Sequence, residues 1–163
     1  MKRTPSLDGL ALLLCLFAIL GLPAHVAAGT EASGAAFEVE FHSPPGPSSM
    51  PFSESVRVGN LLFLAGQIGA VLTEGARGLP PGGIGPETRQ TMENIRAALE
   101  RQGLTMNDVV KCTVMLADIA EWAAMNEVYR TFFTDHFPAR SAFGASGLAL
   151  GARVEIECIA AFQ

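Results

Sequence analysis

Two amphipathic helical segments, with an alternating strand-like segment between them, constrain the fold of this chain more than any other feature. The first predicted helix begins at Pro86, because proline is favoured at the first helical position, and it ends before Gly103. Its apolar side chains recur at helical spacing, at Met92, Ile95 and Leu99. This spacing predicts a helix with one buried face.

The second predicted helix follows Asp118, which together with Glu121 resembles a capping box. We expect it to end at Phe137-Pro138, because the residue before a proline disfavours helical geometry. Its apolar face consists of Met125, Val128, Tyr129, Phe132 and Phe133. Both helices therefore need a common layer to pack against.

Strands are predicted at 37–41, 55–58, 61–65, 110–116, 140–145 and 154–159. Gly59-Asn60 suits a two-residue hairpin turn between the second and third of these strands. In the predicted strand 110–116, the alternate residues expected to face the core are Val110, Cys112, Val114 and Leu116. The glycine-rich segment 75–85 predicts a surface loop without regular structure.

Strands interleaved with two helices predict an α+β fold, in which a single sheet carries both helices on one face. With 163 residues, of which 49% are hydrophobic, the chain has room for one domain with a packed core. The strands carry more apolar residues than one helical layer can bury. We therefore expect the uncovered face to hold identical chains together as a homo-oligomer.

The N-terminal segment is typical of a secretory signal peptide. Lys2 and Arg3 precede an apolar run at 10–22, and small residues then favour cleavage after Ala28. The apolar run is shorter than the roughly 20 residues that cross a bilayer. The expected organisation is a signal peptide (1–28), a flexible leader with a short strand (29–50) and one domain (51–163).

This organisation predicts an exported protein, periplasmic or secreted, that leaves the membrane after cleavage. The alternatives are an uncleaved N-terminal anchor, or a cytoplasmic protein if the leader is not functional. Cys15 lies in the predicted signal peptide, whereas Cys112 and Cys158 fall on the apolar phase of strands. We expect the latter two to be buried free thiols, although an oxidising compartment would permit a disulfide between them.

Charge and motif content exclude several classes of function. The net charge is −5 and basic residues are scattered singly, which argues against nucleic-acid binding. His42 and His136 stand alone, so no metal site is predicted. The glycines at 82–85 lack the lysine and the preceding strand of a phosphate-binding loop, and no serine or cysteine has the context of a nucleophile. We therefore expect a small-molecule partner.

The clearest candidate site combines Arg140 with Glu155 and Glu157, which share one strand face. The planar fork of arginine binds a carboxylate through two hydrogen bonds, and a glutamate can hold a water or move a proton. Such a pair could bind and hydrolyse an acid. The alternative is that Arg140 forms a structural ion pair with one of the glutamates, and spacing alone favours this alternative.

Several sequence blocks favour a ligand-binding Arg140 over the structural ion pair. They lie at 51–68, 87–95, 108–114, 126–129, 137–141 and 154–157, and the last two read FPARS and VEIE. In order and spacing these blocks resemble the RidA (YjgF) family from about Pro51 to Ala161. The resemblance implies a chorismate-mutase-like α+β fold, a homotrimer with ligand clefts between subunits, and no cofactor.

The resemblance also implies an activity, the hydrolytic deamination of reactive enamines and imines. Its substrates would be 2-imino acids such as 2-iminobutanoate and 2-iminopropanoate, and its products 2-keto acids and ammonia. By position, Arg140 matches the arginine that binds the substrate carboxylate, and Glu155 matches the acid associated with the hydrolytic water. Gly66 and Ala142 match positions that contribute backbone groups to the cleft.

Three further residues match cleft positions: Phe52 and Ala65 line the cleft, and Asn126 lies near it. Phe52 stands where many members carry tyrosine, and Ala65 stands where many carry serine, so two hydroxyl groups are missing. We therefore expect a shift towards more apolar substrates. Ala142 replaces a frequent cysteine, which argues against thiol chemistry in the cleft.

Two other functions remain open at this point. The first is a non-enzymatic, exported trimer that binds small ligands or acts like a chaperone, which the altered cleft and the predicted export favour. The second is RNA cleavage, an activity attributed to some relatives, against which the acidic charge argues.

Overall fold

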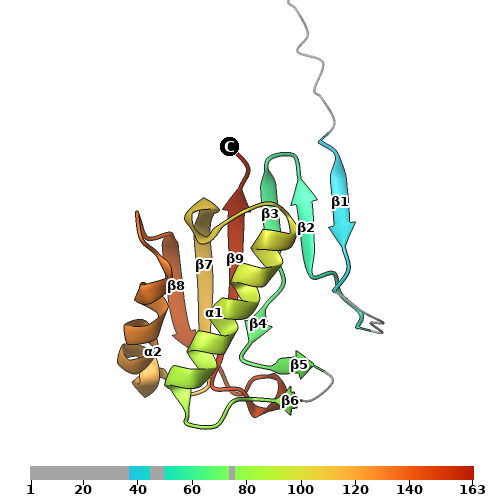
Figure 1. Cartoon of the computed structure of the whole chain (residues 1–163). Coiled ribbons are helices and arrows are strands. Elements are labelled where there is room, and N and C mark those ends of the chain that lie inside the picture. The colour runs from blue at the N-terminus through green and yellow to red at the C-terminus, as the bar shows by residue number, and fades with distance from the viewer. Residues whose placement is uncertain (1–36, 45–49, 74–75) are drawn as a thin grey trace, which may run out of the picture. The chain divides into compact units, whose positions relative to one another are not determined.

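The computed structural model describes residues 37–44, 50–73 and 76–163 (Figure 1). The predicted signal peptide, and the part of the leader before residue 37, lie outside the described residues. The strands are β1 (Val39–His42), β2 (Ser55–Val58), β3 (Leu61–Leu64), β4 (Gln67–Ile68), β5 (Val71–Thr73), β6 (Ala76–Gly78), β7 (Val109–Leu116), β8 (Ala139–Gly144) and β9 (Val154–Ala161). The helices are α1 (Ile84–Arg101) and α2 (Trp122–Tyr129), and four short 3₁₀ turns are η1 (Met106–Asp108), η2 (Ile119–Glu121), η3 (Arg130–Phe132) and η4 (Ala149–Gly151).

The main sheet has the strand order β1-β2-β3-β9-β7-β8, and β4 pairs with β9 further along that strand. Among the described strands of this sheet only β7 and β8 run parallel, because α2 crosses between them and returns the chain to the same end of the sheet. The expected hairpin between 55–58 and 61–65 is present as β2 and β3. The expectation of no regular structure at 75–85 is wrong at its start, because β6 pairs with β5 in a small second sheet.

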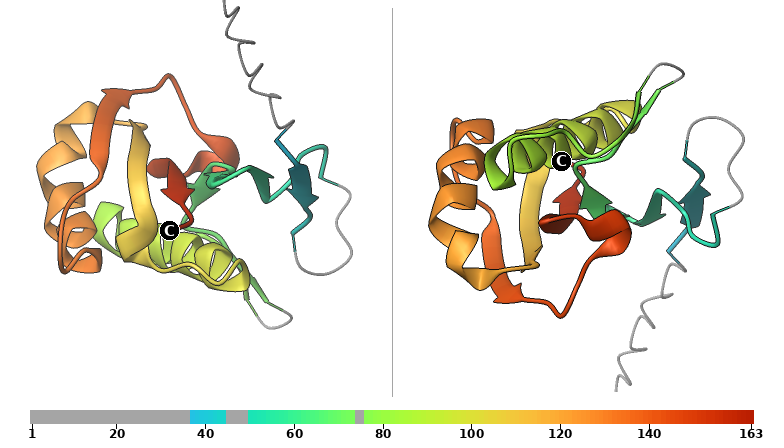
Figure 2. Two further views of the ribbon diagram at one scale, coloured as in Figure 1. Left: turned by 90° about the horizontal axis from the view of Figure 1, so that it is seen from above. Right: turned by 90° about the horizontal axis from the view of Figure 1, so that it is seen from below.

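Both α-helices lie on the same face of the main sheet, as predicted, and no α-helix of the described residues covers the opposite face (Figure 2). Met92, Ile95 and Leu99 of α1 are fully buried against the strands, which confirms the helical spacing seen in the sequence. The helix begins at Ile84, two residues before the predicted start. Gly103 follows its end with φ of 73°, a left-handed conformation that glycine adopts without strain.

The second helix is shorter than predicted. Asp118 accepts a hydrogen bond from the Ala120 N–H and caps the 3₁₀ turn η2 rather than α2. The α-helix ends at Tyr129, well before Phe137-Pro138, and continues as the 3₁₀ turn η3. Phe133 then takes an extended backbone and packs its ring 5.0 Å from that of Tyr129. The helix thus ends earlier than the proline rule predicted, and the aromatic pair packs where the backbone becomes extended.

A β-bulge alters the predicted phase of β7. The register with β9 shifts between Val109 and Lys111, so Val109 is buried while Val110 is 45% exposed. An extra residue in one strand moves its neighbours to the other face. Val110 was expected to be buried, and this expectation is wrong, whereas Cys112, Val114 and Leu116 are buried as predicted.

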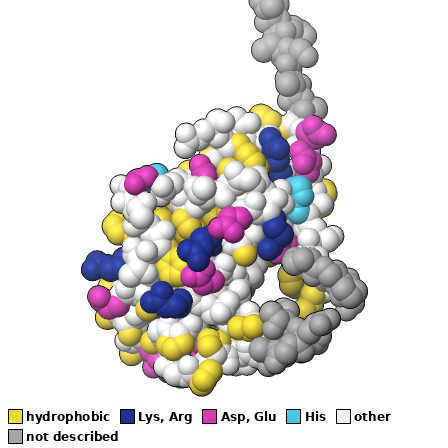
Figure 3. Space-filling view, viewed as in Figure 1, with side chains coloured by type: hydrophobic (Ala, Val, Ile, Leu, Met, Phe, Trp, Pro, Cys, Tyr) yellow, Lys and Arg dark blue, Asp and Glu magenta, His cyan; other side chains and the backbone are white. Residues whose placement is uncertain are grey.

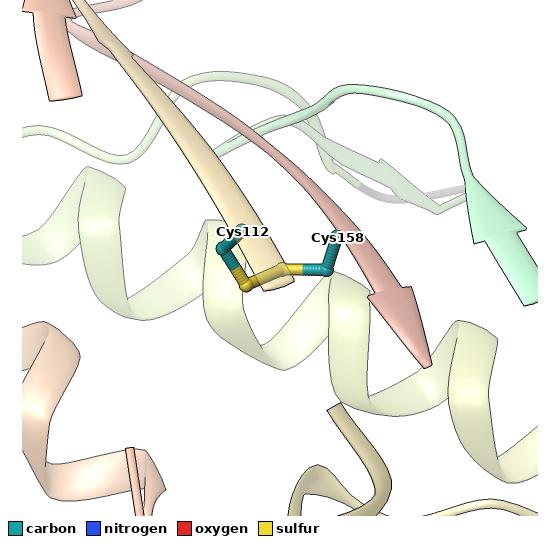
Figure 4. The surroundings of a disulfide bond; sticks show 2 residues. All are labelled: Cys112 and Cys158. Carbon is teal, nitrogen blue, oxygen red and sulfur yellow. A yellow bond between two sulfur atoms is a disulfide. The ribbon is translucent and has the colours of Figure 1, made fainter. Parts of the chain in front are cut away.

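Cys112 and Cys158 form a disulfide bond, so the expectation of free thiols is wrong. The two residues are directly opposite each other in the antiparallel pair β7 and β9, with Cα atoms 4.1 Å apart. Figure 4 shows the bond joining the two strands on the side where α1 lies. Both residues were correctly placed in the core, but only the register of the strands makes them neighbours.

Candidate functional site

Arg140 lies on the helix-bearing face of the sheet, on the edge strand β8. Its register partner in the neighbouring strand β7 is Cys112. Paired residues of neighbouring strands project to the same face of a sheet. Cys112 belongs to the core beneath the helices. Ala142 pairs with Val114, shares this face and packs against the same core.

The guanidinium of Arg140 is stacked on aromatic rings. Its central carbon lies 4.6 Å from the ring centre of Tyr129 and 5.9 Å from that of Trp122, both in α2. Among the described residues no carboxylate forms an ion pair with Arg140. The alternative that the sequence spacing favoured, a structural ion pair between Arg140 and a glutamate of the last strand, is therefore wrong for these residues. Stacking holds the guanidinium plane while its N–H groups remain available to an anion.

An open pocket of about 490 Å³ surrounds Arg140. Its lining comes from α2, the following turn and the start of β8: Trp122, Ala123, Asn126, Glu127, Tyr129, Arg130, Phe137, Pro138 and Arg140. Two residues singled out from the sequence, Asn126 and Arg140, therefore share one cavity.

The Tyr129 side chain is buried, and its hydroxyl has no hydrogen-bond partner among the described residues. Burial raises the pKa of this phenol to about 12, and the opposing attraction of Arg140 for the phenolate is the smaller effect. Tyr129 thus stays neutral beneath Arg140.

Glu155 lies on the opposite face of the sheet. Val154 and Ile156 on either side of it are buried beneath the helices, and side chains alternate along a strand. Its carboxylate covers Gly66, since a Cβ atom at Gly66 would lie 2.1 Å from Glu155 Oε1. The structure thus brings Gly66 and Glu155 together, and a glycine is required where the two meet.

Phe52 and Ala65 lie close to this second cluster. The Ala65 N–H donates a 2.9 Å hydrogen bond to the carbonyl of Glu54, which holds the segment with Phe52 beside the end of β3. Phe52 is 54% exposed, so its ring is available for contact with a further molecule.

The predicted site residues thus form two clusters rather than one. Arg140, Asn126 and Ala142 lie with α2 and β8, whereas Glu155, Gly66, Ala65 and Phe52 lie around β3, β4 and β9. The sheet separates Arg140 from Glu155, so within one chain they do not face the same small molecule.

The three aromatic residues of the pocket, Trp122, Tyr129 and Phe137, were not singled out as site residues from the sequence. Trp122, Asn126 and Tyr129 stand four and three residues apart, a spacing that puts them on one helical face. That spacing was a usable signal, but an aromatic stripe on a helix more commonly belongs to the core. Their contact with Arg140 depends on how α2 packs beside β8.

Surface charge and possible metal ligands were compared over the described residues. On the face that carries the helices, basic and acidic side chains are interspersed rather than gathered into a basic patch (Figure 3). No group of three metal-ligating side chains occurs among the described residues. No described helix has the length and apolar character needed to cross a membrane.

Comparison with known proteins finds similarity along most of the described domain. A family model for Endoribonuclease L-PSP matches residues 44–162. A 2-iminobutanoate/2-iminopropanoate deaminase of Mus musculus is 40% identical over 110 residues, which cover 68% of this chain and 80% of that protein. A RutC family protein of Pyrococcus horikoshii is 44% identical over 110 residues, 68% of this chain and 86% of that protein.

Two solved structures illustrate the similarity of fold. The yeast protein YEO7 has a TM-score of 0.68 at 34% identity, with 77% of this chain and 100% of that chain covered. The E. coli protein TdcF, solved with bound serine, has a TM-score of 0.65 at 30% identity, with 77% and 98% covered.

Proposed function

Because this chain belongs to the Endoribonuclease L-PSP (YjgF/RidA) family, we propose that it hydrolyses 2-imino acids to 2-keto acids and ammonia. Relatives from mouse, goat and cattle are named 2-iminobutanoate/2-iminopropanoate deaminases. The serine bound by TdcF carries a carboxylate next to a nitrogen-bearing carbon, as 2-imino acids do.

The observation that carries the proposal is the unpaired guanidinium of Arg140 in an aromatic pocket. An arginine that is held by stacking and lacks a carboxylate partner in the described chain is ready for one from a ligand. In the proposed site Arg140 binds the substrate carboxylate. Asn126, in the same pocket, offers an amide to the substrate nitrogen.

The reaction needs only water as co-reactant. Glu155 accepts a proton from a water whose oxygen attacks C2 of the iminium form of the substrate. Glu155 then returns this proton to the nitrogen of the resulting carbinolamine. As the C–N bond breaks, ammonia leaves, Glu155 accepts the proton of the hydroxyl group and the carbonyl of the 2-keto acid forms. Glu155 finally passes that proton to the released ammonia, which departs as ammonium. The imine carbon is already electrophilic, so positioning of the water and substrate supplies most of the rate enhancement.

Since the sheet separates Arg140 from Glu155, we propose that each site is completed by two copies of the chain, Arg140 from one and Glu155 from the next. The helix-free face supports such an assembly, because paired strands place Phe41, Val56, Phe63 and Ile159 in one row across it. Phe41 and Phe63 are 71% and 41% exposed in the single chain. A homotrimer of this kind also agrees with the expectation drawn from the family.

Ala142 contributes backbone groups in this assembly. The Ala145 N–H donates to the Leu116 carbonyl of β7 at 2.7 Å, and N–H directions alternate along a strand. The N–H and C=O groups of Ala142 therefore point to the free edge of β8, where a neighbouring copy or its ligand can reach them.

Mixing two inactive variants tests the proposal. Arg140→Ala and Glu155→Gln should each abolish ammonia release from enzymatically generated 2-iminobutanoate. If the two residues come from different copies, co-refolding the variants in equal amounts should restore about a quarter of wild-type activity, because that fraction of sites then combines both intact residues. No restoration would refute the shared site, and full activity of either single variant would refute its role.

The same assay separates deamination from the alternative of a ligand-binding trimer. Carboxylate-induced thermal stabilisation that Arg140→Ala abolishes, without any ammonia release by the wild type, would overturn deamination in favour of binding. Salt-sensitive RNA cleavage in its place would support a nuclease instead.

We further propose that the chain is exported after cleavage near Ala28. The disulfide between Cys112 and Cys158 supports this, since such bonds persist mainly in oxidising compartments. Mass spectrometry of the purified protein should find a mature N-terminus at about Gly29, and a chain that begins at Met1 would refute export.

A further inference from the structure

We infer that the pocket beside Arg140 selects carboxylates that carry an aromatic or long apolar side chain. On the basis of the proposed function, its preferred substrates are then 2-imino acids derived from aromatic and bulky apolar amino acids. Trp122 and Phe137 are the residues that determine this preference.

The size of the pocket is the first argument. A volume of about 490 Å³ lies within the roughly 300–1,000 Å³ of sites that enclose drug-sized ligands. A 2-imino acid with a side chain of only one or two carbons would contact Arg140 and leave most of the pocket to water. A phenyl or indole group would occupy that space.

The second argument is the aromatic lining. Trp122 is 46% exposed and Phe137 is 64% exposed, and both line the pocket. Phe137 is held edge-on against the ring of Phe133, with ring centres 6.0 Å apart, and Trp122 begins α2. Two positioned rings with exposed faces offer stacking surfaces for a planar apolar group.

The third argument is the charge in the pocket. Besides Arg140, the lining contains one basic and one acidic side chain, Arg130 and Glu127, so a single net positive charge remains. One carboxylate neutralises it. The uncharged polar lining otherwise consists of Asn126, so a polar substrate side chain would find few partners there.

Calorimetric titration of the full mature protein with unreactive acids tests the inference without relying on turnover. The probes are 3-phenylpropanoate and propanoate, which share the carboxylate and differ by the ring. We expect 3-phenylpropanoate to bind at least about tenfold more tightly, as burial of a phenyl group implies. Arg140→Ala should weaken both acids.

The variants Trp122→Ala and Phe137→Ala should each reduce the preference to about threefold or less. Phe37→Ala is the matched control, because Phe37 is 74% exposed and does not line the pocket, and it should keep the full preference. Trp122 is the only tryptophan of the chain, so its fluorescence should change on binding of 3-phenylpropanoate to the wild type.

Equal affinity for the two acids, or a preference that survives both variants, would overturn the inference. Failure of the proposed deamination has a different signature: selective binding without ammonia release from either 2-iminobutanoate or 2-imino-3-phenylpropanoate. If both imines are hydrolysed, a higher kcat/KM for the aromatic one is expected, and a preference for 2-iminobutanoate would refute the inference while leaving the deamination intact.

Discussion

Reduction of the Cys112–Cys158 disulfide should destabilise the domain substantially. The bond closes a loop with a sequence separation of 46 residues between two central strands. The loop-closure entropy that it removes from the unfolded chain corresponds to about 4 kcal/mol of stabilisation at 25 °C. The folded state changes little on reduction, because both sulfur atoms stay in the core as small apolar groups.

The assay is guanidinium unfolding followed by Trp122 fluorescence, with protein refolded in a glutathione redox buffer and measured with and without dithiothreitol. Protein concentration is held constant, because assembly shifts apparent stability. We expect unfolding free energy to fall by about 4 kcal/mol and the thermal midpoint by about 10 °C or more. The double variant Cys112→Ala/Cys158→Ala should match the reduced wild type in both conditions.

Two results would refute this reasoning. One is a wild type whose midpoint is unchanged by reductant although mass spectrometry shows that the bond was present. The other is an oxidised, unfolded protein in which both Cys112 and Cys158 react with a thiol reagent.

Further predictions concern single residues. Gly66→Ala would bring a methyl group to 2.1 Å from Glu155 Oε1 and so displace the carboxylate. We expect the rate of ammonia release to fall at least about tenfold, with little change in the thermal midpoint of unfolding. A fully active variant would contradict the role of this contact. Gly69→Ala would place its Cβ 2.7 Å from the backbone oxygen of Glu87, and chemical unfolding should show a loss of about 1–3 kcal/mol, whereas wild-type stability would argue against this close approach. Burial raises the pKa of Tyr129 from 10.0 to about 12. Between these two values the folded chain keeps a proton that the unfolded chain releases. The contribution of Tyr129 to the free energy of unfolding is therefore fully present below pH 10 and is lost as the pH rises to about 12. Ultraviolet titration of this single tyrosine should give a midpoint near 12 when folded and near 10 when unfolded, and equal midpoints would refute its burial.

Local periodicity predicted most elements of the fold. The recurrence of Met92, Ile95 and Leu99 identified the buried face of α1, because side chains three and four residues apart share one helical face. The alternation of Val154, Ile156 and Cys158 identified the buried face of β9 for the corresponding reason. These patterns depend on neighbours along the chain, which are visible in the sequence itself.

The candidate site was predicted as a set of residues but not as an arrangement. Arg140, Glu155 and Gly66 were identified from the family blocks around them, but the close contact of Gly66 with Glu155 was found only in the structure. Alternation within each strand could not show that Arg140 and Glu155 face opposite sides, because this depends on the register of β8 and β9 against β7. The aromatic contacts of Arg140 likewise depend on the packing of α2.

The amino-acid sequence by itself therefore determined the order and type of most helices and strands, the burial of Cys112 and Cys158, and membership of the family. Only the tertiary structure decided that the two cysteines bond, that a bulge exposes Val110, and that the predicted site residues divide between two faces. The physical reason is that helix and strand periodicities arise from neighbouring residues, whereas register, bulges and the approach of distant side chains follow from the packing of the whole domain.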